Sequence, residues 1–119
     1  MASPEIRCDS PGAILVDGKR YARSVIVHPR GVDLDWPKRH RGRALTGKVI
    51  KAWLKHYKPE VLIIGLGAGG TKVALTRKAI ARLETSKIQW HALPTKRACE
   101  QYQQLCQDQR VVAALHIEG

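Results

Sequence analysis

The run Val61–Ile64, with the sequence VLII, constrains the fold of this chain more than any other feature. It is short, uninterrupted and partly β-branched, which is typical of a strand that other elements cover on both faces. Extended and helical patterns alternate after residue 46. We therefore expect a layered α/β domain in which this strand is central.

The expected elements follow from periodicity and from turn and capping residues. We expect strands near residues 13–16, 20–27, 32–34, 61–64, 88–93 and 111–117, with a further extended piece at 71–75. Asp17-Gly18 predicts a type I′ hairpin turn between the first two strands. We expect helices near residues 46–57, 77–83 and 94–107, with Thr46, Thr76 and Thr95 as their N-caps.

This order predicts the fold class and the domain organisation. Strands and helices alternate without a linker, a repeat or a low-complexity tract, so residues 1–119 are expected to form one α/β domain. The central sheet should be mixed and flanked by helices, with a β-hairpin at its N-terminal side. Residues 1–10 are expected to form a flexible tail.

Cysteine usage and hydropathy bear on the compartment. Cysteine occurs only at positions 8, 99 and 106, without a Cys-x-x-Cys pair, which argues against a disulfide framework or a zinc site. No stretch resembles a signal peptide or reaches the length of a membrane span. These patterns predict a soluble protein of a reducing compartment, the cytoplasm.

Cys99 and Cys106 are expected on one helix, seven residues apart. Helical rise puts their Cα atoms about 10 Å apart, too far for a disulfide. Their place on an apolar stripe favours a packing role. The alternative is a reactive thiol at Cys99, since amides near the Thr95 helix start lower the pKa of a nearby thiol.

The glycine-rich stretch Gly65–Gly70 spells G-x-G-x-x-G after a strand, the fingerprint of a dinucleotide-binding turn. That turn needs a helix that begins within the motif and an acid after the second strand. Here the next helix begins at Thr76, and the nearest acid, Glu84, precedes the second strand. Two alternatives to a dinucleotide site remain. Either the glycines serve only a sharp backbone turn with positive φ, or their successive amides form a nest that binds a small anion. The nest would use Gly65, Gly67, Gly69, Gly70 and Lys72.

Positive charge is concentrated in residues 36–59, which contain no Asp or Glu, in a chain of formal net charge +11. Such a segment is either a solvated face or a surface that binds RNA, DNA or an acidic protein. Trp53 lies on the apolar stripe of the expected helix and therefore adds no base-stacking platform. The candidate polyanion-binding residues are Lys38, Arg39, Arg41, Arg43, Lys48, Lys51, Lys55 and Lys58.

Four stretches together resemble a known family: GAILVDGKRYARSVIVHP (12–29), PEVLIIGLGAGG (59–70), LPTKRACEQYQQL (93–105) and RVVAALH (110–116). Their order and spacing are similar to those of the Mth-type domain family. It includes uncharacterised prokaryotic proteins, the adipogenesis-associated Mth domain-containing protein of animals and a mitochondrial assembly factor for respiratory complex I. The resemblance implies a mixed α/β fold with a hammerhead-like N-terminal part, and it implies no catalytic residues.

The sequence departs from this family in the segment WPKRHRGRAL (36–45), where relatives tend to carry more tryptophan and a histidine before a leucine. Any role that the family gives to this loop is therefore in doubt here. The basic character of the loop is a property of this chain.

No nucleophile elbow, P-loop or paired carboxylates are present, and the histidines at 28, 40, 56, 91 and 116 lack metal-pair spacing. We therefore expect no catalytic site, no metal and no cofactor. The first hypothesis is a protein-binding or assembly-assisting module with an unknown partner protein. The second is a binder of nucleic acid or another polyanion, and the third is a small-anion or nucleotide site at the glycine turn.

Overall fold

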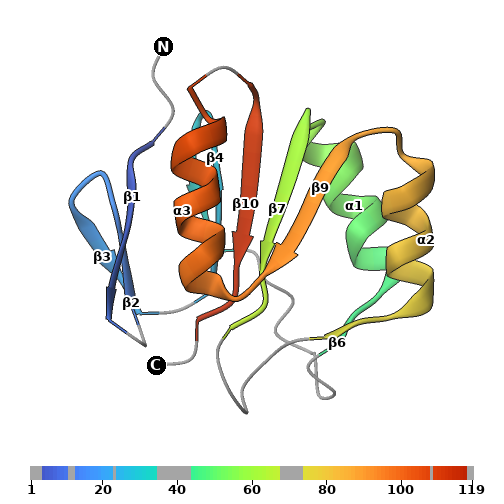
Figure 1. Ribbon diagram of the computed structural model, residues 1–119, viewed down its shortest axis with the longest axis horizontal. Coiled ribbons are helices and arrows are strands. Elements are labelled where there is room, and N and C mark those ends of the chain that lie inside the picture. Colours follow the sequence, from blue (N-terminus) through green and yellow to red (C-terminus); the bar gives the residue numbers. More distant parts are fainter. Residues whose placement is uncertain are drawn as a thin grey trace.

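The computed structural model describes residues 4–10, 13–22, 24–34, 44–67, 74–107 and 109–117, without the side chains of residues 8–10. Its helices are α1 (Gly47–Tyr57), α2 (Arg77–Thr85) and α3 (Thr95–Leu105). Its strands are β1 (Ile6–Ser10), β2 (Ala13–Val16), β3 (Lys19–Tyr21), β4 (Val25–His28), β5 (Gly31–Asp33), β6 (Ala44–Leu45), β7 (Val61–Gly65), β8 (Ala74–Leu75), β9 (Gln89–Leu93) and β10 (Val111–Leu115). Figure 1 shows their arrangement.

The central sheet is mixed, as the alternation predicts. Its five strands lie in the order β5-β4-β10-β7-β9, in which β10, β7 and β9 are parallel and β4 and β5 are antiparallel to their neighbours. All residues of β7 and β10 are buried. The prediction that Val61–Ile64 forms a central strand is therefore confirmed.

Each face of this sheet has its own core, because successive side chains point to opposite faces. Val61 and Ile63 of β7 pack in the core with α3 and the N-terminal strands, whereas Leu62 and Ile64 pack in the core with α1 and α2. In Figure 1, α3 lies in front of the sheet and α1 behind it. The domain therefore has the layered α/β architecture expected from sequence.

The N-terminal part is a separate three-stranded antiparallel sheet, β1-β2-β3, whose apolar side chains join the core under α3. Asp17 and Gly18 both have positive φ, 50° and 85°, as the predicted type I′ turn requires. The expected tail at residues 1–10 is wrong for Ile6–Ser10. This stretch pairs with β2, and the side chain of Ile6 is fully buried.

The single strand expected at residues 20–27 is also wrong. Tyr21 ends β3 in the N-terminal sheet, and Val25 begins β4 in the central sheet. The chain passes from one sheet to the other between these residues. The apolar pattern covers both strands and does not reveal the change of sheet, because both sheets face the same core.

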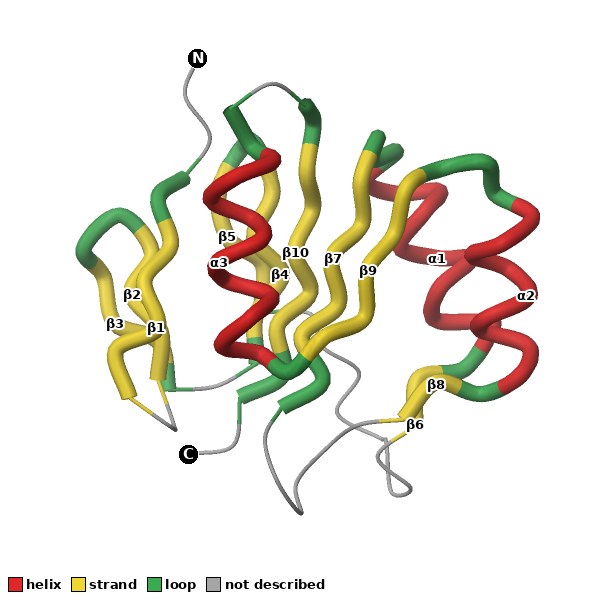
Figure 2. The backbone as a smooth tube through the Cα atoms, in the orientation of Figure 1, coloured by secondary structure: helices red, strands yellow, loops and turns green. Residues whose placement is uncertain are grey.

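Helices α1 and α2 begin side by side and run in the same direction, as Figure 2 shows. Each follows one strand of a short parallel pair, β6 and β8, and Thr76 N donates to Leu45 O. The predicted N-caps Thr46 and Thr76 are confirmed, since their side chains accept from Val49 N and Ala79 N. Thr95 is not a cap: Pro94 holds that position in α3, without a side-chain bond.

Replacing Thr76 by alanine is expected to destabilise the domain by about 1 kcal/mol, because one amide at the start of α2 loses its acceptor. Thermal or urea unfolding measures this change. Thr76→Ser should restore most of the stability. Thr85→Ala, in the last turn of the same helix, is the control and should cost clearly less. Equal losses for the two alanine variants would contradict the capping role.

Candidate functional site

The outer sides of α1 and α2 carry a surface of exposed cations, here called the basic surface. Within the described residues, none of its members makes an ion pair. The two helices contain one acidic residue, Glu84. The basic surface consists of Lys48, Lys51, Lys55, Lys58, Arg77, Lys78, Arg82 and Lys87, all exposed.

The cations of the two helices face each other across the contact between α1 and α2. A Cβ atom added to Gly47 would lie 3.1 Å from Lys78 Cβ, so Lys78 stands at this contact. The helices run in the same direction, and residues four apart share a face. Lys51 and Arg82, one turn further along α1 and α2, therefore also lie on the sides that face each other.

The sequence predicts only half of this surface. Lys48, Lys51, Lys55 and Lys58 are exposed on α1, whereas Lys38, Arg39, Arg41 and Arg43 lie outside the described residues. The four cations on and after α2 were missed because the basic segment was bounded at Pro59. The signal was present in the sequence, since the helix at 77–85 carries three cations and one acid.

The described part of the glycine turn is closed by internal hydrogen bonds. Leu66 N donates to Leu93 O, and Gly67 N donates to the hydroxyl of Thr95 at 2.8 Å. Gly67 is buried and has a φ of 94°, a conformation that favours glycine. The amides of residues 66 and 67 are therefore engaged within the domain. Gly69, Gly70 and Lys72 lie outside the described residues.

Thr95 joins three segments where the parallel strands end. Its hydroxyl accepts from Gly67 N and donates to His116 O, both at 2.8 Å. Its backbone N donates to Gly67 O. Gly65 permits this approach, since a Cβ there would lie 2.9 Å from Leu115 Cδ2 and 3.0 Å from Thr95 Oγ1. The glycine at position 65 therefore has a packing reason: the start of α3 rests directly on the end of β7.

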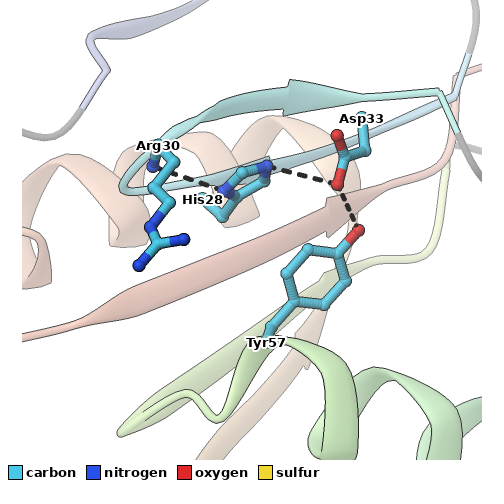
Figure 3. Close-up of polar contacts among 4 residues, drawn as sticks. All are labelled: His28, Arg30, Asp33 and Tyr57. Atoms are coloured by element: carbon cyan, nitrogen blue, oxygen red, sulfur yellow. Dashed lines mark hydrogen bonds and ion pairs between the residues drawn. The ribbon is translucent and has the colours of Figure 1, made fainter.

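A polar cluster that the sequence did not reveal lies between β4, β5 and α1 (Figure 3). Tyr57 donates its hydroxyl to Asp33 Oδ2 at 2.7 Å, and His28 Nε2 lies 3.2 Å from the same oxygen. Arg30 N donates to His28 Nδ1, so the neutral ring carries its proton on Nε2. The Nε2 atom lies within ion-pair distance of the Asp33 carboxylate, but its N–H group is not aligned for a hydrogen bond.

This cluster holds the end of α1 against the β4–β5 hairpin. His28 has one ring nitrogen occupied by a backbone amide and the other beside Asp33, so neither is free to act as a base toward a substrate. The signal available in the sequence was Tyr57 itself, because a tyrosine on an apolar stripe needs a partner for its hydroxyl.

The cysteines differ from the expectation. Cys99 is 2% exposed and is disulfide-bonded, so it presents no free thiol for the reactive role. This bond also removes the argument for a reducing compartment that rested on cysteine usage. Cys106 is free, which agrees with the absence of a bond between the two helical cysteines. Desolvation by burial raises the pKa of the Cys106 thiol, which keeps it protonated at neutral pH.

Two further observations concern the described residues alone. They contain no group of three or more His, Cys, Asp or Glu side chains that could hold a metal ion. Among their helices, none has the length and apolar character that crossing a membrane requires.

A family model described as protein of unknown function, DUF498/DUF598, matches residues 6–116. The chain belongs to this family. The match spans all three described sheets and all three described helices, so it concerns the whole domain rather than one motif. No curated protein gave a match.

Solved structures of other proteins share the fold. A conserved hypothetical protein from Pyrococcus horikoshii OT3 is 22% identical with a TM-score of 0.79, over 96% of this chain and 98% of that chain. A Xanthomonas campestris protein is 21% identical with a TM-score of 0.78, over 100% and 88%. A Mth938-like domain from Bordetella pertussis is 19% identical with a TM-score of 0.67, over 98% and 87%.

These similarities confirm the resemblance to Mth-type domains and the fold that it implies. Identities this low establish the architecture and leave the activity open.

Replacing Tyr57 by phenylalanine removes the hydrogen bond to Asp33 and keeps the ring. We expect a loss of about 1 kcal/mol in the free energy of unfolding, since a half-buried bond to a carboxylate is lost. Tyr21→Phe is the control, because no hydrogen bond of the Tyr21 hydroxyl is present among the described residues. Chemical denaturation of both variants provides the test, and equal stabilities would contradict the role of the cluster.

Replacing Gly65 by alanine is expected to destabilise the domain by about 1–3 kcal/mol, because the new methyl group would overlap Leu115 and the hydroxyl of Thr95. Combining it with Leu115→Ala relieves one of these two overlaps only. A loss smaller in the double variant than the sum of the two single losses is the expected result. An unchanged unfolding midpoint for Gly65→Ala would show that α3 can move away from β7.

Proposed function

We propose that this chain is a non-enzymatic binding module that holds an acidic segment of a partner protein on its basic surface. The observation that carries the proposal is the charge of this surface. It consists of eight exposed cations, while its two helices contain only one acid. Within the described residues these cations lack ion-pair partners, so they are available to an anionic partner.

The placement of the cations strengthens this argument. Like charges on neighbouring helix turns repel one another and lower the stability of the domain slightly. Lys51 and Arg82 lie on the sides of α1 and α2 that face each other, so their charges add to the same local field. An acidic segment lying along this contact would relieve the repulsion. The field would also raise the association rate of such a partner.

The composition of the surface favours an acidic protein over single-stranded nucleic acid. Binding of single strands relies on aromatic side chains that stack with bases. Trp53 is 6% exposed and packs in the core, and Tyr57 is bound to Asp33. Trp90 lies on β9, is half-buried and packs against the same core. Acidic side chains need only the ammonium and guanidinium groups that the surface presents.

An assembly-assisting role is the second part of the proposal, and it rests on resemblance. The Mth-type family includes an assembly factor for respiratory complex I, which acts by binding partner proteins. A module that binds one acidic segment reversibly is suited to such work.

Binding of nucleic acid through residues 36–59 is the second candidate. Duplex DNA or RNA needs cations at its phosphates and no stacking platform, so the same basic surface could hold it. The third candidate is a small-anion site at the glycine turn, for which fewer backbone amides are available than the motif suggests. The amide of Gly67 is already bonded to Thr95, so a nest would depend on Gly69, Gly70 and Lys72.

The double variant Lys51→Glu/Lys55→Glu tests the proposed surface. Binding of a fluorescent poly-glutamate peptide should weaken about thirtyfold, because two attractive contacts of roughly 0.5 kcal/mol each become repulsive contacts of similar size. Lys96→Glu/Arg97→Glu is the matched control: it reverses two exposed charges on α3, across the sheet from α1, and should leave most of the affinity. Equal losses in both variants would indicate net charge alone.

A competition experiment separates the two macromolecules. Poly-glutamate and a mixed-sequence DNA duplex are titrated against the protein at several salt concentrations. A poly-glutamate affinity that equals or exceeds the duplex affinity at physiological salt supports the acidic protein. Tighter binding of the duplex, lost in the Lys51/Lys55 double variant, would favour the nucleic-acid candidate. No binding of either ligand at low salt would reject the basic surface as a binding site.

A further inference from the structure

The edge strand β9 lacks the features that usually protect a sheet edge. In the described residues it pairs with β7 alone, in regular register over five residue pairs. Its sequence, QWHAL, contains no charged residue, no proline and no glycine. Edges are normally protected by short length, charge, proline or a bulge. The opposite edge, β5, has three residues and carries Asp33, and the N-terminal sheet ends at β3 with Lys19 and Arg20.

The backbone hydrogen bonds show which groups of β9 point outward. Gln89 N donates to Glu60 O, and Leu93 O accepts from Leu66 N, so these two residues direct their backbone groups toward β7. Backbone direction alternates along a strand. The N–H and C=O groups of Trp90 and Ala92 therefore point away from the sheet. No hydrogen bond within the described part of the chain uses them.

We propose that this edge binds a second copy of the chain, with the two β9 strands antiparallel and a twofold axis passing at His91. The outward-pointing residues lie symmetrically, one on each side of His91. Such an axis places Trp90 of each copy opposite Ala92 of the other copy. Each of these pairs can exchange two N–H···O bonds, as in any hydrogen-bonded antiparallel pair. The edge is thus complementary to itself, as a twofold interface requires.

Helix α2 supplies a second self-complementary contact beside this edge. Figures 1 and 2 show α2 at the β9 end of the sheet. Lys78 and Arg82 lie on its side toward α1, whereas Arg77, Ile80 and Glu84 follow one another along its other exposed side. Ile80 is half-buried and belongs to neither core. Part of this apolar side chain therefore stays exposed, outside both cores.

The same twofold axis orients α2 antiparallel to its copy. We place this axis over the middle of α2, near Ile80, so that the two Ile80 side chains would face each other. It also brings Arg77 opposite Glu84 of the second copy, and Glu84 opposite Arg77. Opposite charges at the two ends and an apolar centre are the composition expected of a specific helix contact. This complementarity favours a second copy over an unrelated peptide at the edge.

The net charge gives the dimer a distinctive salt dependence. Two copies with a formal charge of +11 each repel one another, and salt screens this repulsion. Association of the copies should therefore strengthen with salt. Binding of an acidic partner to the basic surface should weaken with salt, so the two processes can be told apart in one protein.

Sedimentation velocity of the full chain, over a range of concentrations at low and high salt, is the first measurement. We expect a dimer whose fraction rises with concentration and with salt. Ala92→Pro removes an outward N–H that the β7 ladder does not use, so the domain should fold normally, as circular dichroism can verify. Its association constant should fall roughly tenfold or more. A monomer under every condition, or an unchanged dimer in folded Ala92→Pro, would overturn the proposal.

A charge-exchange cycle on α2 tests the proposed dimer interface even if Ala92→Pro fails to fold. Arg77→Glu places two acids opposite each other and should weaken the dimer by about threefold or more. Adding Glu84→Arg to this variant restores opposite charges and should restore the dimer. Lys48→Glu on α1 changes the net charge equally to Arg77→Glu and serves as the matched control. If the two single variants behave alike and the second exchange rescues nothing, the interface does not lie here.

Discussion

The burial of β7 and β10 on both faces is the constraint on which the rest of this structure depends. Every residue of the two strands is buried, so neither face of the sheet can be left to solvent. One face requires α3 and the N-terminal sheet, and the other requires α1 and α2. The layers are therefore a consequence of two apolar strands.

Beyond the ends of these strands, backbone N–H and C=O groups no longer pair with a neighbouring strand and need other hydrogen-bond partners. Thr95 meets this need by bonding Gly67 and His116, and it reaches them because Gly65 has no side chain. A glycine-rich turn at this place serves close packing. In a nucleotide-binding turn the amides would face a ligand, whereas here the described amides of Leu66 and Gly67 bond the end of β9 and the start of α3. The same glycine pattern can therefore result from close packing of the backbone or from binding of a ligand.

The sequence predicts the elements that local chemistry determines. The three helices, the Thr46 and Thr76 caps, the Asp17-Gly18 turn and the central strand follow from periodicity and capping residues. The sequence does not predict β1, because a five-residue strand with three polar residues has no local signature and depends on pairing with β2. The His28–Asp33–Tyr57 cluster is missed for a related reason. Its members come from three elements, and only the tertiary fold brings them together.

The two proposed surfaces differ in what selects them physically. The basic surface is a consequence of composition, since cations on two parallel helices accumulate with few acids to neutralise them. Its attraction acts over a Debye length and needs no particular geometry. The β9 edge carries no charge, and its attraction depends on the register of backbone groups at Trp90 and Ala92.

These surfaces also influence each other through α2. Pairing through β9 would orient the sides of α2 that carry Arg77 and Glu84 toward the second copy, while Lys78 and Arg82 stay on the side toward α1. The basic surface, apart from Arg77, would then be present twice in one particle, on either side of the twofold axis. An acidic partner that reaches both copies would offset the repulsion between them, so binding at one surface would strengthen association at the other. The uncharged edge and the basic surface are therefore physically compatible, and they become coupled once a partner neutralises the charge that keeps the copies apart.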